Sequence, residues 1–130
     1  MPPRLDLNCD LGEGGGHDAE LMGLITSANI ACGAHAGDAA TMAATVALAR
    51  LRGVAIGAHP GFEDRENFGR KEVPLSAAAV GALVAGQVAA LRALGPVGHV
   101  KVHGALYHLA AREARWADAV AEAVRATDPT

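Results

Sequence analysis

Short apolar segments alternate along the chain with longer stretches of helical pattern, and this alternation limits the fold more than any other feature. Strands are predicted for Leu5–Cys9, Ser27–Ala31, Val54–Ala58 and His99–Val102. Consecutive strands joined by helical crossovers run parallel, because only antiparallel neighbours can be joined by a tight turn. The sequence therefore predicts an α/β fold of four strand–helix units around a parallel sheet.

Capping residues mark the ends of the predicted helices. These helices run from the cap Asp18 to Leu24, from the cap Asp38 to Arg52 before the stop Gly53, from the cap Ser76 to the stop Gly95, and from Glu113 to Ala126. A polar loop spans residues 61–74, and no linker or low-complexity tract divides the chain. We therefore expect residues 1–130 to belong to a single domain.

Composition excludes several classes of protein. Hydrophobic residues make up 51% of the chain and charged residues 19%, which excludes a disordered tail. The net charge of −3, without a basic run, argues against nucleic-acid binding, and no apolar stretch reaches the ~18 residues of a membrane span. Cys9 and Cys32 are too few for a disulfide scaffold, which indicates reduced thiols in a cytoplasmic protein. Because 30 of the hydrophobic residues are alanine, we expect a thin core that gains from a partner or from a further segment of chain.

Ionisable residues follow every predicted strand. The set comprises Asp10 and Glu13 after the first strand, His35 and Asp38 after the second, His59 after the third, and Lys101 and His103 at the end of the fourth. His35 and His59 occupy matching places in a local repeat, since Gly33–Gly37 resembles Gly57–Gly61. Parallel strands end at the same edge of a sheet, where α/β proteins bind their ligands. We therefore expect these side chains to share one site.

Several of these residues also have a purely structural interpretation. Asp38 can serve only as a helix cap, and Asn29, an unusual amide within a strand, can bond the backbone or point into a polar centre of a barrel. A buried Lys101 would need a partner charge, which Asp10 could supply. Arg70 belongs to a basic group in the polar loop that either is solvated or holds an anionic substrate.

Metal binding competes with acid–base chemistry as a use for this cluster. Imidazole and carboxylate ligands suit Zn, Mn or Fe, and Asp10, His59 and His103 could supply them, although no HExxH or CxxC spacing occurs. Phosphate-binding motifs are incomplete, because there is no Walker A sequence and the run Gly12–His17 ends in histidine where the dinucleotide fingerprint needs glycine. We do not expect the chain alone to be a complete ATPase.

Five segments, in order along the chain, resemble the LamB/YcsF family, whose members are the A-type subunit of the ATP-dependent 5-oxoprolinase. The matching segments are Asp6–Glu13, Ile25–Asp38, Gly57–Gly61, Phe68–Arg70 and Val100–Tyr107. The resemblance implies a seven-stranded (β/α) barrel-like fold of the glycoside hydrolase and polysaccharide deacetylase type. Residues 1–130 would then be the N-terminal part of one such domain and contain its first four βα units.

The resemblance also implies an activity and partners. The implied reaction is cleavage of the 5-oxoproline lactam to glutamate, driven by ATP with Mg²⁺ and carried out together with subunits B and C. Whether a further metal is bound stays open. Two alternatives also stay open: a metal-dependent deacetylase or other amide hydrolase that works without ATP, and a non-catalytic half-barrel that only binds partners.

Roles within the site follow from the residue types. We expect Asp10 or His59 to act as the general base for water, His35 and His103 to polarise or protonate the lactam, and Lys101 to hold the substrate carboxylate. The remaining substrate-binding candidates are Glu13, Asn29, Asp38 and Arg70. Because four units cannot close a barrel, the first and fourth strands would expose unpaired edges, and we expect a dimer, a larger assembly or a marginally stable fragment.

Overall fold

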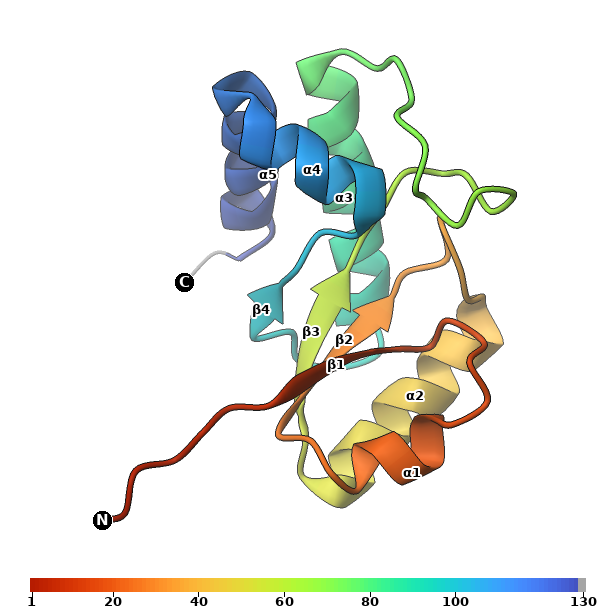
Figure 1. The fold of residues 1–130 in the computed structure, drawn as a ribbon, viewed down its shortest axis with the longest axis vertical. Coiled ribbons are helices and arrows are strands. Elements are labelled where there is room, and N and C mark those ends of the chain that lie inside the picture. Colours follow the sequence, from red (N-terminus) through yellow and green to blue (C-terminus); the bar gives the residue numbers. More distant parts are fainter. Residues whose placement is uncertain (129–130) are drawn as a thin grey trace.

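The structure, a computed structural model, describes residues 1–128, in which four strands form one parallel sheet (Figure 1). The strands lie side by side in chain order: β1 (Asn8–Leu11), β2 (Ser27–Ala31), β3 (Ala55–His59) and β4 (His99–Val100). The helices are α1 (Asp18–Met22), α2 (Ala39–Arg52), α3 (Ala77–Arg92), α4 (Gly104–Arg112) and α5 (Ala114–Thr127). The predicted α/β fold with a parallel sheet is confirmed, whereas the barrel stays a prediction.

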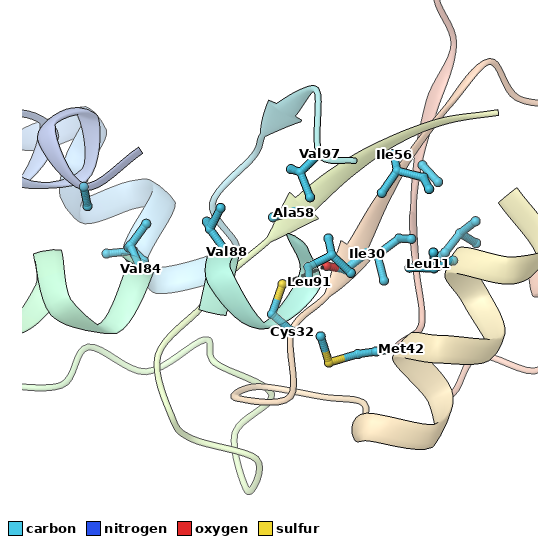
Figure 2. Packing of buried hydrophobic residues seen from close by; sticks show 14 of the residues in the cluster. Leu11, Ile30, Cys32, Met42, Ile56, Ala58, Val84, Val88, Leu91 and Val97 are labelled. Atoms are coloured by element: carbon cyan, nitrogen blue, oxygen red, sulfur yellow. Dashed lines mark hydrogen bonds between the residues drawn. The ribbon is translucent and has the colours of Figure 1, made fainter. Parts of the chain in front are cut away.

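The two faces of the sheet differ in polarity because successive side chains of a strand point to opposite sides. One face carries Leu11, Ile30 and Ile56, which are buried in the hydrophobic core. Figure 2 shows these side chains together with Met42 of α2 and Leu91 of α3. The core therefore lies between the sheet and the helices, and the opposite face is left for polar residues.

The register of the paired strands places Asp10, Asn29 and His99 in one row across that second face, with Gly57 between Asn29 and His99. Asp10 of β1 lies opposite Asn29 of β2, Asn29 lies opposite Gly57 of β3, and Gly57 lies opposite His99 of β4. β1 and β4 are the edge strands of the sheet within residues 1–128, as the sequence predicted. The row therefore joins one edge of the sheet to the other.

The first strand begins later than predicted. The alternation of Leu5 and Leu7 suggested strand structure from Leu5, but these side chains are exposed and β1 begins only at Asn8. The Asp6 carboxylate accepts hydrogen bonds from the hydroxyls of Thr26 and Ser27 just before the strand. The Leu7 carbonyl still accepts from the backbone N–H groups of Thr26 and Ser27, and Figure 1 shows the chain before it extending away from the rest of the molecule.

Of the four predicted helix starts, three are confirmed, including Glu113 before α5, and one is wrong. Asp38 and Ser76 each accept a hydrogen bond from a first-turn backbone N–H, as N-caps do. Asp18 instead lies inside α1 and its carboxylate accepts from the backbone N–H of Gly12. None of the helices in the described residues combines the length and the apolar character that a membrane span requires.

The C-terminal part of the chain holds one more helix than predicted. α4 occupies residues 104–112, for which the sequence pattern predicted no helix. α3 ends at Arg92 with Ala93 as its C-cap, so Gly95 is not the stop. In contrast, Gly53 ends α2 in the left-handed conformation, as predicted.

Candidate functional site

Three histidines from successive βα units meet at the carboxyl end of the sheet. His35 lies in the loop after β2, His59 is the last residue of β3, and His103 immediately precedes α4. All three are buried, with 1%, 1% and 6% of their surface exposed. The rings of His35 and His103 stack with centroids 3.7 Å apart, and the His59 ring meets both edge-on. The structure thus brings together the three histidines that the sequence assigned to one site.

Backbone carbonyls fix the orientation of two of these rings. His59 Nδ1 donates to the Lys101 carbonyl oxygen at 2.6 Å, and His103 Nε2 donates to the Phe68 carbonyl oxygen at 2.7 Å. A carbonyl oxygen can only accept, so each of these outer nitrogens carries the proton. The inner nitrogens, His59 Nε2 and His103 Nδ1, face each other at 3.0 Å. Burial lowers the pKa of His103, which favours its neutral form.

Glu13 supplies the carboxylate of the cluster from the loop after β1. Its Oε2 accepts from His35 Nε2 at 2.6 Å and lies 3.7 Å from both His59 Nε2 and His103 Nδ1. One potential ligand atom from each of these four residues lies within 4.8 Å of the other three. Of the three predicted metal ligands, His59 and His103 belong to this group in the described chain and Asp10 does not. Glu13 and His35, which the sequence did not single out as metal ligands, complete it.

Asp10 lies beside this cluster and forms an ion pair with Lys101, the partner that the sequence suggested. Lys101 Nζ lies 2.9 Å from Asp10 Oδ1, and His59 Nε2 lies 3.4 Å from Asp10 Oδ2. Partial burial opposes ionisation of Asp10. The contact with His59 in its protonated form and hydrogen bonds from Lys101 and Asn29 outweigh it, so that the pKa of Asp10 is well below its ordinary value. The carboxylate is therefore ionised at neutral pH.

Asn29 connects this ion pair to the opposite edge of the sheet. Its amide nitrogen donates to Asn8 at 2.8 Å and to Asp10 at 3.0 Å, and its oxygen lies 2.7 Å from His99 Nε2. The His99 ring reaches Asn29 across Gly57, where an added Cβ would lie 2.0 Å from the ring nitrogen. Glycine within a strand commonly marks such a close approach, and this signal was present in the sequence.

A residue that the sequence analysis left without a role, Phe68, closes the loop side of the cluster. Its ring packs edge-on against His35 and His103 at centroid distances of 5.3 and 5.0 Å. The loop approaches closely because Gly69 has no side chain, and an added Cβ there would lie 2.7 Å from His35 Cβ. An aromatic residue next to glycine in an otherwise polar loop was the available sequence signal.

Gln87 of α3 holds the start of this loop in place. Its side chain accepts from the backbone N–H of Gly61 at 3.1 Å and donates to the Gly61 carbonyl at 2.8 Å. Both hydrogen bonds are buried. The loop is therefore anchored to α3 directly beneath the histidine cluster.

Two predicted binding residues lie outside the cluster. Asp38 is exposed and its carboxylate caps α2 by accepting from Thr41 N at 2.7 Å. Arg70 is exposed and its guanidinium lies over the Phe68 ring, 5.2 Å from the ring centroid. Arg70 is thus one aromatic ring away from the histidines, and Asp38 has the structural role that the sequence left open.

A small open pocket adjoins the cluster. It has a volume of about 280 Å³ and is lined by Asp10, His59, Lys101, Val102, His103, Gly104, Tyr107 and His108. A larger groove of about 690 Å³ lies between α3 and α5, but alanine and glycine line most of it. Because specific ligand sites combine a cavity with a few convergent polar groups, the smaller pocket is the better candidate.

Comparison with known proteins agrees with the motifs described above. The LamB/YcsF family profile matches residues 5–130. The fold superimposes on the crystal structure of a lactam utilization protein from Thermus thermophilus, with a TM-score of 0.94 and 47% sequence identity. That alignment covers 98% of this chain and 56% of the other, so this chain spans little more than half of that protein's length. Since the family match extends over nearly all of the sequence, the chain belongs to the LamB/YcsF family.

Proposed function

We propose that this chain is part of the A-type subunit of an ATP-dependent 5-oxoprolinase, which works with subunits B and C. Membership in the LamB/YcsF family and similarity to a lactam utilization protein support the substrate class. The observation that carries the proposal is the pocket at the sheet edge, where His59 and the Asp10–Lys101 ion pair converge. The substrate is a lactam that bears a carboxylate. A cationic side chain can bind that carboxylate, and an imidazole beside it can act as a base in cleavage of the lactam.

The proposed chemistry follows from the stability of the lactam. Its nitrogen lone pair is delocalised into the carbonyl, which makes the carbon a poor electrophile. Transfer of the γ-phosphoryl group of ATP to the carbonyl oxygen releases ADP and leaves an imidate that water can attack. The C–N bond then breaks as the nitrogen takes up a proton, and a second water hydrolyses the resulting acyl phosphate to glutamate and phosphate.

We assign the role of general base to His59 rather than Asp10. The Nδ1–H bond to the Lys101 carbonyl leaves the lone pair of the neutral ring on Nε2, at the wall of the pocket. The lowered pKa of Asp10 makes its carboxylate a weak base. Asp10 instead lies where it stabilises a protonated His59, with its Oδ2 3.4 Å from Nε2.

Lys101 is the candidate for binding the substrate carboxylate. Its side chain remains 44% exposed although it pairs with Asp10, so its ammonium group can contact a ligand in the pocket. Asn29 is buried and its amide is used by protein partners, and we infer that it positions Asp10 instead of contacting substrate. Of the other cluster residues, His103 lines the pocket and is our candidate for contacting the lactam carbonyl, whereas His35 and Glu13 are not among the residues that line it.

The test is glutamate release from 5-oxoproline by the chain combined with subunits B and C, in the presence of Mg²⁺ and ATP. We expect turnover that needs ATP, that is lost in His59→Gln, and that is unchanged in His17→Gln, an exposed histidine away from the pocket. Lys101→Met should raise KM for 5-oxoproline far more than it lowers kcat. Efficient turnover without ATP would reject the proposed reaction.

A further inference from the structure

Two of the buried histidines in the cluster present lone pairs to each other. Each outer ring nitrogen donates to a backbone carbonyl, from His59 to Lys101 and from His103 to Phe68. In the neutral rings the inner nitrogens, His59 Nε2 and His103 Nδ1, are therefore unprotonated, and they lie 3.0 Å apart. Two facing lone pairs repel in a buried setting, so this geometry requires a positive charge between or beside them.

The same hydrogen bonds are the ones that metal-binding histidines make. A histidine ligand nearly always donates its other ring N–H to a carbonyl or carboxylate, which fixes the tautomer and the ring orientation. His59 and His103 are both held in this way by main-chain oxygens. Their ligand lone pairs are therefore aimed at a common point before any ion arrives.

Glu13 and His35 complete a set of four donors around this point. Glu13 Oε2 lies 3.7 Å from the inner nitrogens of both His59 and His103, and 2.6 Å from His35 Nε2. All four ligand atoms lie within 4.8 Å of one another. Around a tetrahedral ion with bonds of about 2.0–2.1 Å, ligand atoms would stand roughly 3.3 Å apart. The separations of 2.6, 3.0 and 3.7 Å lie near this value, but the rings of His35 and His103 are stacked and one of them has to tilt for both to point at one ion.

A further sign of an incomplete environment is the Nδ1 atom of His35. It is buried and has no hydrogen-bond partner in the described chain. Among residues 1–128, the Glu13 carboxylate is accordingly the one hydrogen-bonding partner that holds the His35 ring. A turn of either side chain toward a shared ion would break no side-chain hydrogen bond of the described residues other than the one between them.

We propose that Glu13, His35, His59 and His103 form a binding site for one divalent transition-metal ion. Three imidazoles and one carboxylate suit Zn²⁺, Co²⁺, Mn²⁺ or Fe²⁺, whereas Mg²⁺ and Ca²⁺ prefer all-oxygen ligands. The site is thus distinct from the Mg²⁺ that accompanies ATP. His59 and His103 also line the pocket, so the ion would lie beside a bound substrate. Because the ion would occupy the Nε2 lone pair of His59, metal binding and the general-base role proposed for His59 exclude each other at any one time.

The experiment measures metal binding without substrate, ATP or partner subunits, so its result is separate from that of the turnover test. The full chain is stripped with a chelator and titrated with Zn²⁺ by calorimetry and with Co²⁺ by visible absorption. The variants are Glu13→Gln and His59→Gln. The matched controls are His17→Gln and Glu20→Gln, because His17 and Glu20 form an exposed histidine–carboxylate pair with a separation of 3.3 Å.

We expect one equivalent of Zn²⁺ to bind the wild-type chain and both controls, and to raise their thermal unfolding midpoints. Affinity should fall at least tenfold in Glu13→Gln and His59→Gln, with loss of the Co²⁺ absorption bands. If His59→Gln fails to fold, Glu13→Gln decides, since Glu13 lies in a loop with part of its side chain exposed. Absence of stoichiometric binding, or equal affinity in Glu13→Gln and wild type, would overturn the proposal and leave a proton as the charge between the rings.

Discussion

Replacing Gly69 by alanine should displace the loop that covers the histidine cluster. It should therefore lower the free energy of unfolding by more than the backbone conformation of this position alone would cause. Gly69 has φ +64°, and an added Cβ would lie 2.7 Å from His35 Cβ and 3.0 Å from His103 Cδ2. His35 Cβ is attached directly to the backbone, so the clash cannot be relieved by rotation of a side chain. The loop has to move away from the cluster instead.

Gly53→Ala is the matched control because it isolates the backbone cost. Gly53 has φ +67°, and no heavy atom lies within 4 Å of its added Cβ. A left-handed non-glycine residue costs roughly 1–2 kcal/mol, and this applies to both variants. The steric overlap adds about 1–3 kcal/mol at Gly69 alone. We therefore expect about 1–2 kcal/mol of destabilisation for Gly53→Ala and about 2–5 kcal/mol for Gly69→Ala.

Urea unfolding followed by the fluorescence of Trp116 measures this difference, since Trp116 is the single tryptophan and is buried. With an m-value of about 1–3 kcal/mol per molar urea, the extra loss at Gly69 lowers the unfolding midpoint by about 1 M. Gly69→Ala should also weaken Zn²⁺ binding, whereas Gly53→Ala should not. The steric argument is refuted if the two variants have the same midpoint.

Three further predictions concern acid stability, loop anchoring and thiol reactivity. The pKa of Asp10 is lower in the folded state than in the unfolded state, so ionised Asp10 stabilises the fold fully above the unfolded-state pKa of about 4, and this stabilisation is lost as the pH falls below that value. The thermal unfolding midpoint of Asp10→Asn should therefore decrease less than that of the wild type between pH 5 and pH 3. Gln87→Leu leaves the N–H and C=O of Gly61 without their buried partners and should cost about 2–4 kcal/mol in urea unfolding, and a cost below about 1 kcal/mol would contradict this anchoring role. Burial raises the pKa of Cys32 to about 11, so alkylation monitored by mass spectrometry should modify the partly exposed Cys9 first.

The sequence predicted the layout of the fold because the relevant signals are local. Asp38, Gly53 and Ser76 act through neighbours within a few residues, and all three were interpreted correctly. The start of β1 was not, because the alternation of Leu5 and Leu7 resembles a strand whether or not a partner strand lies beside it. Strand ends depend on pairing, which the sequence of a single segment does not contain.

The position of the candidate site could be predicted from the sequence, but the hydrogen bonds within it could not. The position of His35 and His59 after successive strands was enough to place both at one edge of the sheet. The directions of the His59 and His103 rings depend on the carbonyl oxygens of Lys101 and Phe68, and main-chain atoms are the same in every residue type. The same limit applies to Glu13, whose contact with His35 depends on the path of a glycine-rich loop.

The polar row across the sheet has a consequence for the order of folding. Its contacts join residues far apart in the chain: 70 positions separate His99 from Asn29, and 91 separate Lys101 from Asp10. Contacts of such long range close large loops and form late, whereas helices such as α2 depend on near neighbours. A refolding chain should therefore regain helical circular dichroism before its histidines come together. Any ligand of the assembled site would bind the native state alone and would slow its unfolding without accelerating the earlier steps.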